Sequence, residues 1–489
     1  MPLSFDDTYA RLPEHFFAPV EPTPVREPSL FALNEPLATL LGGSAEEFSS
    51  AEFVSVWAGN RVLPGSLPIA LAYAGHQFGH FVPSLGDGRA ILLGETIGRD
   101  GRRYDVQLKG SGRTPFSRGG DGRATLASVL REYLVSEGMA ALGVPTTRSL
   151  AAVATGDTVW RERPRPGGVL TRIASSHLRV GTFEYFAARR DVAAVQRLAD
   201  YAYERHCPER PAPLGRALAL FEHVLEGQAE LIARWMSFGF IHGVMNTDNC
   251  SIACETIDYG PCAFLDSFEP GRVFSSIDER GRYAFDQQPE IALWNVTRLG
   301  IALASAIDEN PERATALLRE RLAGFESRFD RHFAVAFGRK LGLSGYEESD
   351  DALLRRLLGL MARARADFTN TFRALYDVAA GAAPEAFLSG WKEGASEGAS
   401  EAAAWLEAWR ARRGEAPAEL EAMRTANPAF VPRNHRVEEA LAAAEQGDRS
   451  AFDRLLSAIR RPFDDQPELA DLRQAPGDEQ WTYRTFCGT

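Results

Sequence analysis

Asn249 and Asp258 carry side-chain oxygens of the kind that a divalent cation needs, and they lie close together in the chain. An amide oxygen and a carboxylate are hard ligands, which suit Mg²⁺ or Mn²⁺. Such a cation bridges and neutralises phosphate oxygens. The pair therefore predicts a metal-dependent reaction of a nucleoside triphosphate.

The segment HGVMNTDN, from His242 to Asn249, resembles the catalytic loop of a protein kinase but lacks its base. A kinase places an aspartate two residues after the histidine and adds an Asp-aromatic-Gly turn further on. Val244 stands where that aspartate belongs. Asp248 is predicted either to accept a proton from an attacking hydroxyl or to cap the loop. His242 is predicted to be a packed loop residue.

Lys109 ends the strand-like run VQLK, a pattern in which a strand lysine pairs with phosphate oxygens and with a helix glutamate. The stretch 121–142 has apolar residues at helical spacing and is predicted to be a helix. Glu132, near its middle, is the predicted partner of Lys109, with Glu137 as the alternative. A strand lysine that faces water is the ordinary reading of this pattern.

Glycines and arginines near this strand predict loops that approach phosphate closely. Gly86 and Gly88, with Arg89, precede one strand, and the segment GSGRTPFSRGGDGR, which contains Asp121 and Gly122, follows Lys109. Either loop taken alone fits an ordinary solvated turn. A kinase does not normally place a second such loop before its helix, so the nucleotide is expected to be held from an unusual side.

Arg172 and Arg179 form a second basic pair, seven residues apart. In a helix this spacing puts both on one face, whereas Gly181 and nearby β-branched residues favour a loop equally. Surface arginines are the alternative to an anion-binding pair.

The elements that must position these residues follow from periodicity and turn signals. The pattern predicts a hairpin of two strands at residues 90–95 and 104–108, and two helices within residues 192–240. It also predicts short strands at residues 251–253 and 256–257, which form a short hairpin before Asp258. From about residue 289 onward the chain predicts helices, including an Ala/Glu-rich solvated helical hairpin.

Composition limits the remaining function classes. The 489 residues have 45% hydrophobic side chains and a net charge of −12, which predicts a folded protein that binds neither nucleic acid nor a membrane surface. No apolar run approaches the length of a membrane span, and the N-terminus lacks signal-peptide features, so a cytoplasmic location is expected. The five cysteines predict buried thiols rather than a zinc site.

Several long motifs, in order, carry a family resemblance. They are YAGHQFG, QLKGSGRTP, DGRATL, PTTR, SHLRVGTFE, GFIHGVMNTDN, DYGP, FLDSFEPG, QQPEIALWNVTRL and NPAFVPRNH. With these motifs the chain resembles the selenoprotein O family, called YdiU in bacteria, densely over residues 60–300 and more thinly beyond.

The resemblance implies an α+β fold of the bilobal protein-kinase type with a helical C-terminal extension. The implied division is an N-terminal extended arm (1–60), an N-lobe with nucleotide-binding loops (61–190), a C-lobe with catalytic and metal-binding loops (191–335) and a helical C-terminal region (336–489).

The implied activity is transfer of AMP from ATP, or of UMP from UTP, to Ser, Thr or Tyr hydroxyls of target proteins. The nucleotide would lie reversed relative to a kinase. Asp248 would be the proton acceptor, Asn249 and Asp258 would hold the metal, and Glu132 would support Lys109. The implied nucleotide-binding residues are Gly86, Gly88, Arg89, Lys109, Asp121, Gly122, Arg172, Arg179 and Asp258.

One motif departs from the family. Members often have a cysteine in a segment resembling ICNHSD that is suited to pair with a cysteine near the C-terminus, whereas Phe274 occupies that position here. Cys487 therefore lacks its expected partner, and Cys262 is the alternative. A redox switch through this disulfide is not expected.

Two other hypotheses compete with nucleotide transfer, namely a kinase-type phosphotransferase and an inactive ATP-binding pseudokinase scaffold. Val244 in place of the kinase base disfavours the first. The presence of Lys109, Asn249 and Asp258 disfavours the second.

Overall fold

The computed structural model describes residues 3–389, 396–413, 416–477 and 485, and it shows the predicted α+β class. The strands are β1 (Phe17–Pro19), β2 (Ser29–Leu33), β3 (Ile69–Leu71), β4 (Gly75–Gln77), β5 (His80–Val82), β6 (Ala90–Ile97), β7 (Arg103–Lys109), β8 (Ala124–Thr125), β9 (Arg148–Trp160), β10 (Pro164–Ala174), β11 (Phe240–Ile241) and β12 (Ala263–Phe264). The helices of the first 310 residues are α1 (Glu35–Leu40), α2 (Ala45–Phe48), α3 (Ala51–Trp57), α4 (Leu126–Ala141), α5 (Val180–Ala188), α6 (Val192–His206), α7 (Arg216–Ser237) and α8 (Gln288–Ile307).

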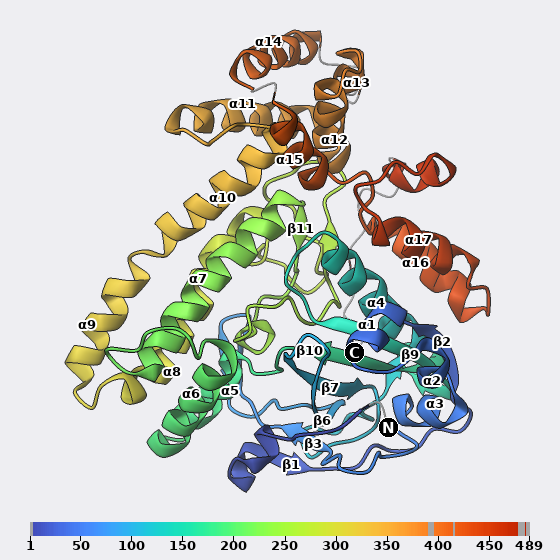
Figure 1. The fold of residues 1–489 in the computed structure, drawn as a ribbon, viewed down its shortest axis with the longest axis vertical. Helices are drawn as coiled ribbons and strands as arrows, with labels where there is room; N and C mark the ends of the chain where they lie inside the picture. The colour runs from blue at the N-terminus through green and yellow to red at the C-terminus, as the bar shows by residue number, and fades with distance from the viewer. Residues whose placement is uncertain (1–2, 390–395, 414–415, 478–484, 486–489) are drawn as a thin grey trace.

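An antiparallel sheet forms the lower part of the molecule in Figure 1. In the described residues it has eight strands in the order β1-β3-β6-β7-β10-β9-β2, with β8 paired to β10. The predicted hairpin is β6–β7, and Lys109 at the end of β7 lies opposite Ala90 on one side and Leu170 on the other. The lysine is thus held in the middle of the sheet.

The first sixty residues contribute to this sheet as well as to the helices beside it. Strand β1 pairs with β3, and β2 pairs with β9. Helices α1–α3 cover one face, where Trp57 packs with Val106 and Leu108 of β7. Because side chains alternate along a strand, Gln107 and Lys109 point to the opposite face.

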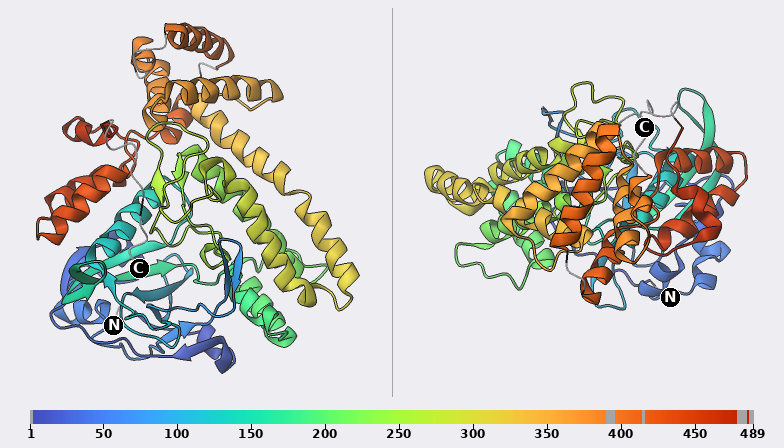
Figure 2. Two further views of the ribbon diagram at one scale, coloured as in Figure 1. Left: turned by 180° about the vertical axis from the view of Figure 1, so that it is seen from behind. Right: turned by 90° about the horizontal axis from the view of Figure 1, so that it is seen from above.

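Helix α4 covers that opposite face and is itself covered by α16 (Asn434–Glu445) and α17 (Ser450–Arg460). Figure 2 shows this pair of C-terminal helices beside α4. The helix begins at Leu126, five residues later than predicted, because Ala124 and Thr125 pair with β10 as β8. The Thr125 hydroxyl then caps α4 by accepting a hydrogen bond from the Ser128 amide.

Long helices form the other half, with α7 packed against α6, α8 and α10 (Phe325–Leu341). The predicted pair within 192–240 is present as α6 and α7. The predicted strands at 251–253 and 256–257 are wrong. Ser251 and Thr256 form only isolated bridges, to Arg179 and Thr146, because their backbones bond to those distant segments instead of to each other.

The stretch Phe285–Ile307, which includes α8, passes a test of length and composition for a membrane span, contrary to the expectation from the sequence. Half of the most apolar 18 residues of this stretch are buried. Helix α8 packs against α5, α6, α7 and α9 (Pro311–Leu322). This packing fits a core helix.

The C-terminal region is helical, as predicted. Beyond α9 it contains α10 (Phe325–Leu341), α11 (Glu348–Ala364), α12 (Phe368–Ala379), α13 (Glu385–Leu388), α14 (Ser396–Arg412), α15 (Pro417–Ala426), α16 and α17. The Ala/Glu-rich stretch forms α14 and α15, but Trp405 and Trp409 of α14 are buried, so this helix packs by one face instead of being wholly solvated.

Candidate active site

A cavity of about 920 Å³ lies between the sheet, α4 and the loops that precede and follow η3 (Thr247–Asn249). It gathers residues from segments far apart in the chain. Every site residue predicted from the sequence lines this one cavity: Gly86, Gly88, Arg89, Lys109, Asp121, Gly122, Glu132, Arg172, Arg179, Asp248, Asn249 and Asp258.

Lys109 and Glu132 form the predicted ion pair, with 2.5 Å between Nζ and Oε2. The same ammonium donates to Oδ1 of Asp258 at 2.8 Å. Glu137, the alternative partner, instead pairs with Arg148 through two hydrogen bonds. The middle of α4 therefore faces the cavity, whereas Glu137 faces the start of β9.

Arg172 and Arg179 also converge on Asp258. Arg172 donates to Oδ1 at 2.9 Å and lies 3.2 Å from Glu132, and Arg179 donates to Oδ2 at 2.9 Å. They are not on one helix, because Arg172 belongs to β10 and Arg179 is the residue before α5. Both side chains are buried, so neither is an ordinary surface arginine.

Asp258 is the common partner of these three cations. Burial alone would raise the pKa of its carboxyl, but Lys109, Arg172 and Arg179 hold that pKa well below its usual value. Its backbone φ of 66° is in the left-handed region, which is strained for a residue with a side chain. A permanently ionised aspartate in a strained turn is typical of a functional site.

Asp248 lies in the short helix η3 and is 9% exposed. Its Oδ2 accepts a long hydrogen bond of 3.4 Å from Gln77, while Oδ1 has no partner among the described residues. Burial raises the pKa of this carboxyl to about 6, although Arg179 opposes the change. Oδ1 is enclosed by protein, whereas Oδ2 is held only by this long bond, and a weakly bonded oxygen with a pKa near neutrality suits a general base.

The hairpin β4–β5 holds this loop from outside. The His76 amide donates to Thr247 Oγ1 at 2.6 Å, and the Phe78 amide donates to Asn246 Oδ1 at 3.0 Å. The imidazole of His76 contacts Glu184 at 2.6 Å, so its role is structural, whereas His80 is exposed.

Asn249 and Asp258 have a donor set that fits Mg²⁺ or Mn²⁺. The Asn249 amide nitrogen donates to the Val244 carbonyl at 3.0 Å, which leaves Oδ1 as the ligand atom. Among the described residues, Asp258 Oδ2 accepts one hydrogen bond, from Arg179, and so retains a lone pair. Within the described residues, no group of three or more His, Cys, Asp or Glu could hold a metal, but Mg²⁺ typically takes few protein ligands and completes its shell with phosphate and water.

The first glycine loop is attached to the second. Thr114 Oγ1 donates to the Asp87 carbonyl at 2.6 Å, and Ser117 Oγ donates to the Gly88 carbonyl at 2.5 Å. Gly86 has φ of 64°, and a Cβ there would lie 2.2 Å from the Phe116 ring. Gly86 is therefore required for the two loops to approach each other.

The second loop is closed by Asp121 and Gly122. Asp121 pairs with Arg161 at 2.8 Å, and a Cβ on Gly122 would lie 2.0 Å from the Gly112 carbonyl oxygen. Arg89 is half-buried on the cavity wall. These loops carry backbone amides and arginines into the cavity, which suits a polyphosphate.

Comparison with known proteins places the chain in a family. The family described as "Protein adenylyltransferase SelO" matches residues 1–460. The chain belongs to the SelO family. The predicted enzyme class, a protein nucleotidyltransferase, is thereby confirmed at the level of the family.

Full-length relatives agree with the SelO assignment. The chain is 54% identical to the protein nucleotidyltransferase YdiU of Methylorubrum populi, with 99% of each chain covered. It is 52% identical to the YdiU proteins of Rhodopseudomonas palustris and Alkalilimnicola ehrlichii, covering 99% of this chain and 99% and 98% of those proteins.

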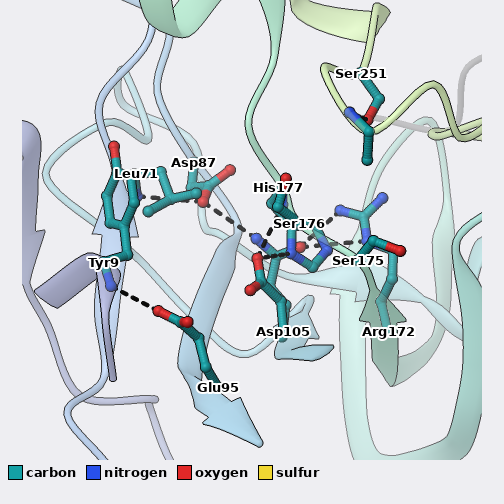
Figure 3. Close-up of polar contacts among 12 residues, drawn as sticks. Tyr9, Leu71, Asp87, Glu95, Asp105, Arg172, Ser175, Ser176, His177 and Ser251 are labelled. Carbon is teal, nitrogen blue, oxygen red and sulfur yellow. Dashed lines mark hydrogen bonds and ion pairs between the residues drawn. The ribbon is translucent and has the colours of Figure 1, made fainter. Parts of the chain in front are cut away.

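Sequence reasoning about this SelO member missed a second layer of residues. Gln107 accepts from Arg172 at 2.8 Å and donates to Asp87 at 3.2 Å, and the Arg179 guanidinium lies over the Tyr73 ring at 4.8 Å. Figure 3 shows Asp87 and Arg172 within this buried polar network. Gln107 had a usable signal, because it lies two residues before Lys109 and so shares its face of the strand.

The remaining histidine and cysteine predictions concern packing. His242 is buried, its Nε2 contacts the Ile257 carbonyl at 2.8 Å, and its ring stacks on Trp235, as expected of a packed loop residue. Phe274 is buried, and Cys487 lies outside the described residues. The four described cysteines, Cys207, Cys250, Cys254 and Cys262, are buried and free.

Proposed function

We propose that the protein transfers AMP from ATP to Ser, Thr or Tyr hydroxyls of target proteins, with UTP as an alternative donor of UMP, and releases pyrophosphate. One observation carries this proposal. A buried carboxylate with an unpaired oxygen, Asp248, shares a cavity with the cation cluster of Lys109, Arg172 and Arg179. The cavity thus contains a base for the hydroxyl and positive charge for the phosphates.

The reaction is an in-line displacement at the α-phosphorus. The target hydroxyl gives its proton to Asp248 as its oxygen bonds to the α-phosphorus, and the bond from that phosphorus to the bridging oxygen of pyrophosphate breaks. Arginine and lysine side chains stabilise negative charge that develops on the phosphoryl oxygens and on the leaving group. Val244, in the kinase base position, supplies no carboxylate.

Asn249 and Asp258 would hold Mg²⁺ or Mn²⁺ in this cavity. When bound, the cation supplies Lewis-acid stabilisation of the phosphate oxygens. Lys109 and Arg172 fix the Asp258 carboxylate through hydrogen bonds to Oδ1, and Arg179 does so through Oδ2. Glu132 keeps Lys109 in place.

The kinase-like bilobal arrangement is part of the same proposal. The N-lobe would be residues 61–190, with the sheet and α4, and the C-lobe would be residues 191–335. Support comes from a sheet with one long covering helix on one side of the cavity and a helical half on the other. Residues 1–60 and 336–489 would be an arm and a helical extension around these lobes.

ATP labelled at either the α- or the γ-phosphate, incubated with a target protein, tests the proposal. Nucleotide transfer leaves α-label on protein, whereas phosphotransfer leaves γ-label. We expect α-label alone, with release of labelled pyrophosphate from γ-labelled ATP. Label from the γ-phosphate on protein would show a kinase, and the absence of both would favour a nucleotide-binding scaffold.

A further inference from the structure

Arg131 is the neighbour of Glu132 on α4 and lines the same cavity, but its guanidinium has partners other than those of Lys109, Arg172 and Arg179. Its guanidinium donates to the carbonyls of Gly260, at 2.9 Å, and Cys262, at 2.6 Å. It also donates to Asn434 Oδ1 and to Glu438 Oε1, both at 2.9 Å. One side chain, 7% exposed, therefore links α4, the segment after Asp258 and helix α16.

Arg131 contacts the segment of residues 258–264, called here the metal-binding segment, through the backbone carbonyls of that segment. Gly260 is two residues after Asp258, and Cys262 precedes β12. Asp258 has a positive φ, and such a strained conformation persists only where the surroundings fix it. Two charged hydrogen bonds to the carbonyls that follow are a direct restraint on this turn.

The contacts of Arg131 with the C-terminal region include Asn434 of the motif NPAFVPRNH. The proposed nucleotide-binding residues do not include this motif. Asn434 reaches Arg131, and the preceding Arg433 pairs with Asp266 at 2.5 Å and with Asp367 at 2.8 Å. Asp266 follows β12. The motif thus attaches to the segment after Asp258 on both sides of β12, once through Arg131 and once through Arg433.

We propose that Arg131 is a positioning residue for nucleotide transfer, through which helix α16 and the NPAFVPRNH motif hold Asp258 in its catalytic geometry. This inference rests on the proposed function. It assigns the C-terminal helical region a part in catalysis: the region fixes the metal-binding turn and the Glu132 helix relative to each other.

The alternative is that Arg131 only stabilises the packing of α4 against α16. Other contacts between these helices allow the two roles of Arg131 to be separated by experiment. Leu130 and Leu134 of α4 pack with Val437 and Phe452 of α16 and α17. These apolar contacts join the helices without Arg131. Removal of one polar contact is therefore expected to leave the helices packed and to change only the restraint on residues 259–264.

Asn434→Ala is the decisive variant, because among the described residues the side chain of Asn434 is linked to the metal-binding segment through its hydrogen bond with Arg131. Arg131→Lys keeps the charge but cannot reach all four partners. Arg436→Gln is the matched control. Arg436 lies in the same first turn of α16 and contacts Glu439 and the Asp471 carbonyl, neither of which belongs to the site.

The first measurement is hydrogen exchange of the backbone amides of residues 259, 260 and 262–264 in the nucleotide-free protein. We expect exchange at least about fivefold faster in Asn434→Ala and Arg131→Lys, and unchanged in Arg436→Gln, because local opening reports the lost restraint. The second is the Mn²⁺ concentration for half-maximal binding of a non-hydrolysable ATP analogue. It should rise about tenfold in the two site variants alone.

The third measurement is steady-state AMP transfer. The kcat should fall roughly 10- to 100-fold in Asn434→Ala and Arg131→Lys, since small misplacements of catalytic groups have effects of this size. Unchanged exchange and Mn²⁺ dependence in Asn434→Ala would overturn the proposal, as would equal effects in Arg436→Gln. If Arg131→Lys does not fold, Asn434→Ala decides alone.

Failure of the proposed function would look different. A wild-type protein that transfers no α-label would contradict nucleotide transfer, while exchange and analogue binding would still report whether Arg131 fixes the metal-binding turn.

Discussion

Asp248 is a buried carboxylate whose position and ionisation differ from those of an ordinary loop aspartate. The lack of a partner for Oδ1 and the raised pKa, about 6, follow from the hairpin β4–β5 and α5 that close around it. A Cβ on Gly75 would lie 2.8 Å from this oxygen, so the hairpin approaches as closely as glycine allows. These properties favour the base over the loop cap, the two roles that the sequence left open.

The pH dependence of transfer should report this carboxyl. Since the base must be ionised, kcat/KM is expected to rise as pH increases through about 6 and to level off above it. Asp248→Asn should lower kcat/KM by about 10²- to 10⁴-fold and remove this limb. Burial also raises the pKa of Asp87 to about 6, so Asp87→Asn is the control. A limb that persists in Asp248→Asn but vanishes in Asp87→Asn would assign it to Asp87.

Asp258 should be a metal ligand whose loss abolishes metal-dependent binding of nucleotide. Asp258→Ala leaves Lys109, Arg172 and Arg179 without their shared anion, so the cavity repels a divalent cation. We expect transfer to fall by roughly 1000-fold, since several kcal/mol of charge stabilisation are lost. Calorimetric titration with Mn²⁺ and an ATP analogue measures binding.

Asp248→Ala is the comparison for that experiment, because it should slow transfer and spare nucleotide binding. Unchanged labelling by Asp258→Ala would refute the metal assignment. Loss of binding in Asp248→Ala would instead make Asp248 a ligand.

At the scale of elements, helix α4 carries two glutamates that have different partners. Glu132 and Glu137 are five residues apart, so they point to different sides of a helix with 3.6 residues per turn. Glu132 meets Lys109 and Arg172 in the cavity, whereas Glu137 meets Arg148 at the start of β9. The position of Glu132 near the middle of the predicted helix favoured it as the partner of Lys109, and the structure confirms that prediction.

Substitution of these two glutamates should therefore give different phenotypes. Glu132→Gln should lower kcat for transfer about 10- to 100-fold through misplacement of Lys109. Glu137→Gln should leave kcat unchanged and lower the free energy of unfolding by about 1–3 kcal/mol, because it weakens a buried charged hydrogen bond. Transfer assays and urea unfolding of both variants measure this. A larger loss of kcat in Glu137→Gln than in Glu132→Gln would contradict the assignment.

At the scale of the whole molecule, the C-terminal helices are part of the structure that holds the site. Helices α16 and α17 cover α4, and Arg433 joins Asp266 and Asp367 while only 1% exposed. A buried arginine between two carboxylates connects three distant segments of the chain. The C-terminal region is thus expected to unfold together with the rest of the protein.

Arg433→Met tests this connection. It leaves two carboxylates in a buried position without their cation and should lower the free energy of unfolding by about 3–5 kcal/mol. Arg449→Gln removes a pair with Asp453 whose side chains are about half exposed, and should change that free energy by less than about 1 kcal/mol. Chemical unfolding followed by fluorescence compares them. Similar stabilities for both variants would show that the Arg433 pairs contribute little.

The parts of the fold and of the site that could be predicted from the sequence depend on local patterns in the chain. Strand β7 and helix α4 follow from alternation and helical spacing, and Lys109, Asn249 and Asp258 follow from residue chemistry. The hairpin predicted at 251–257 failed because its backbone bonds to the segments around Arg179 and Thr146, which no local pattern reveals. Gln77, Tyr73 and Arg131 were missed for the same reason, since their partners lie more than 100 residues away.

The sequence by itself determined the family, the α+β class and the candidate residues, because motifs and periodicity are properties of neighbouring positions. The tertiary structure confirmed that Glu132 meets Lys109, and only the tertiary structure decided that three cations share Asp258 and that Asp248 is buried with an oxygen that has no partner among the described residues. These facts depend on burial and on contacts between distant segments. The pKa of a carboxyl and the partner of a charge are set by such surroundings, which no single stretch of sequence contains.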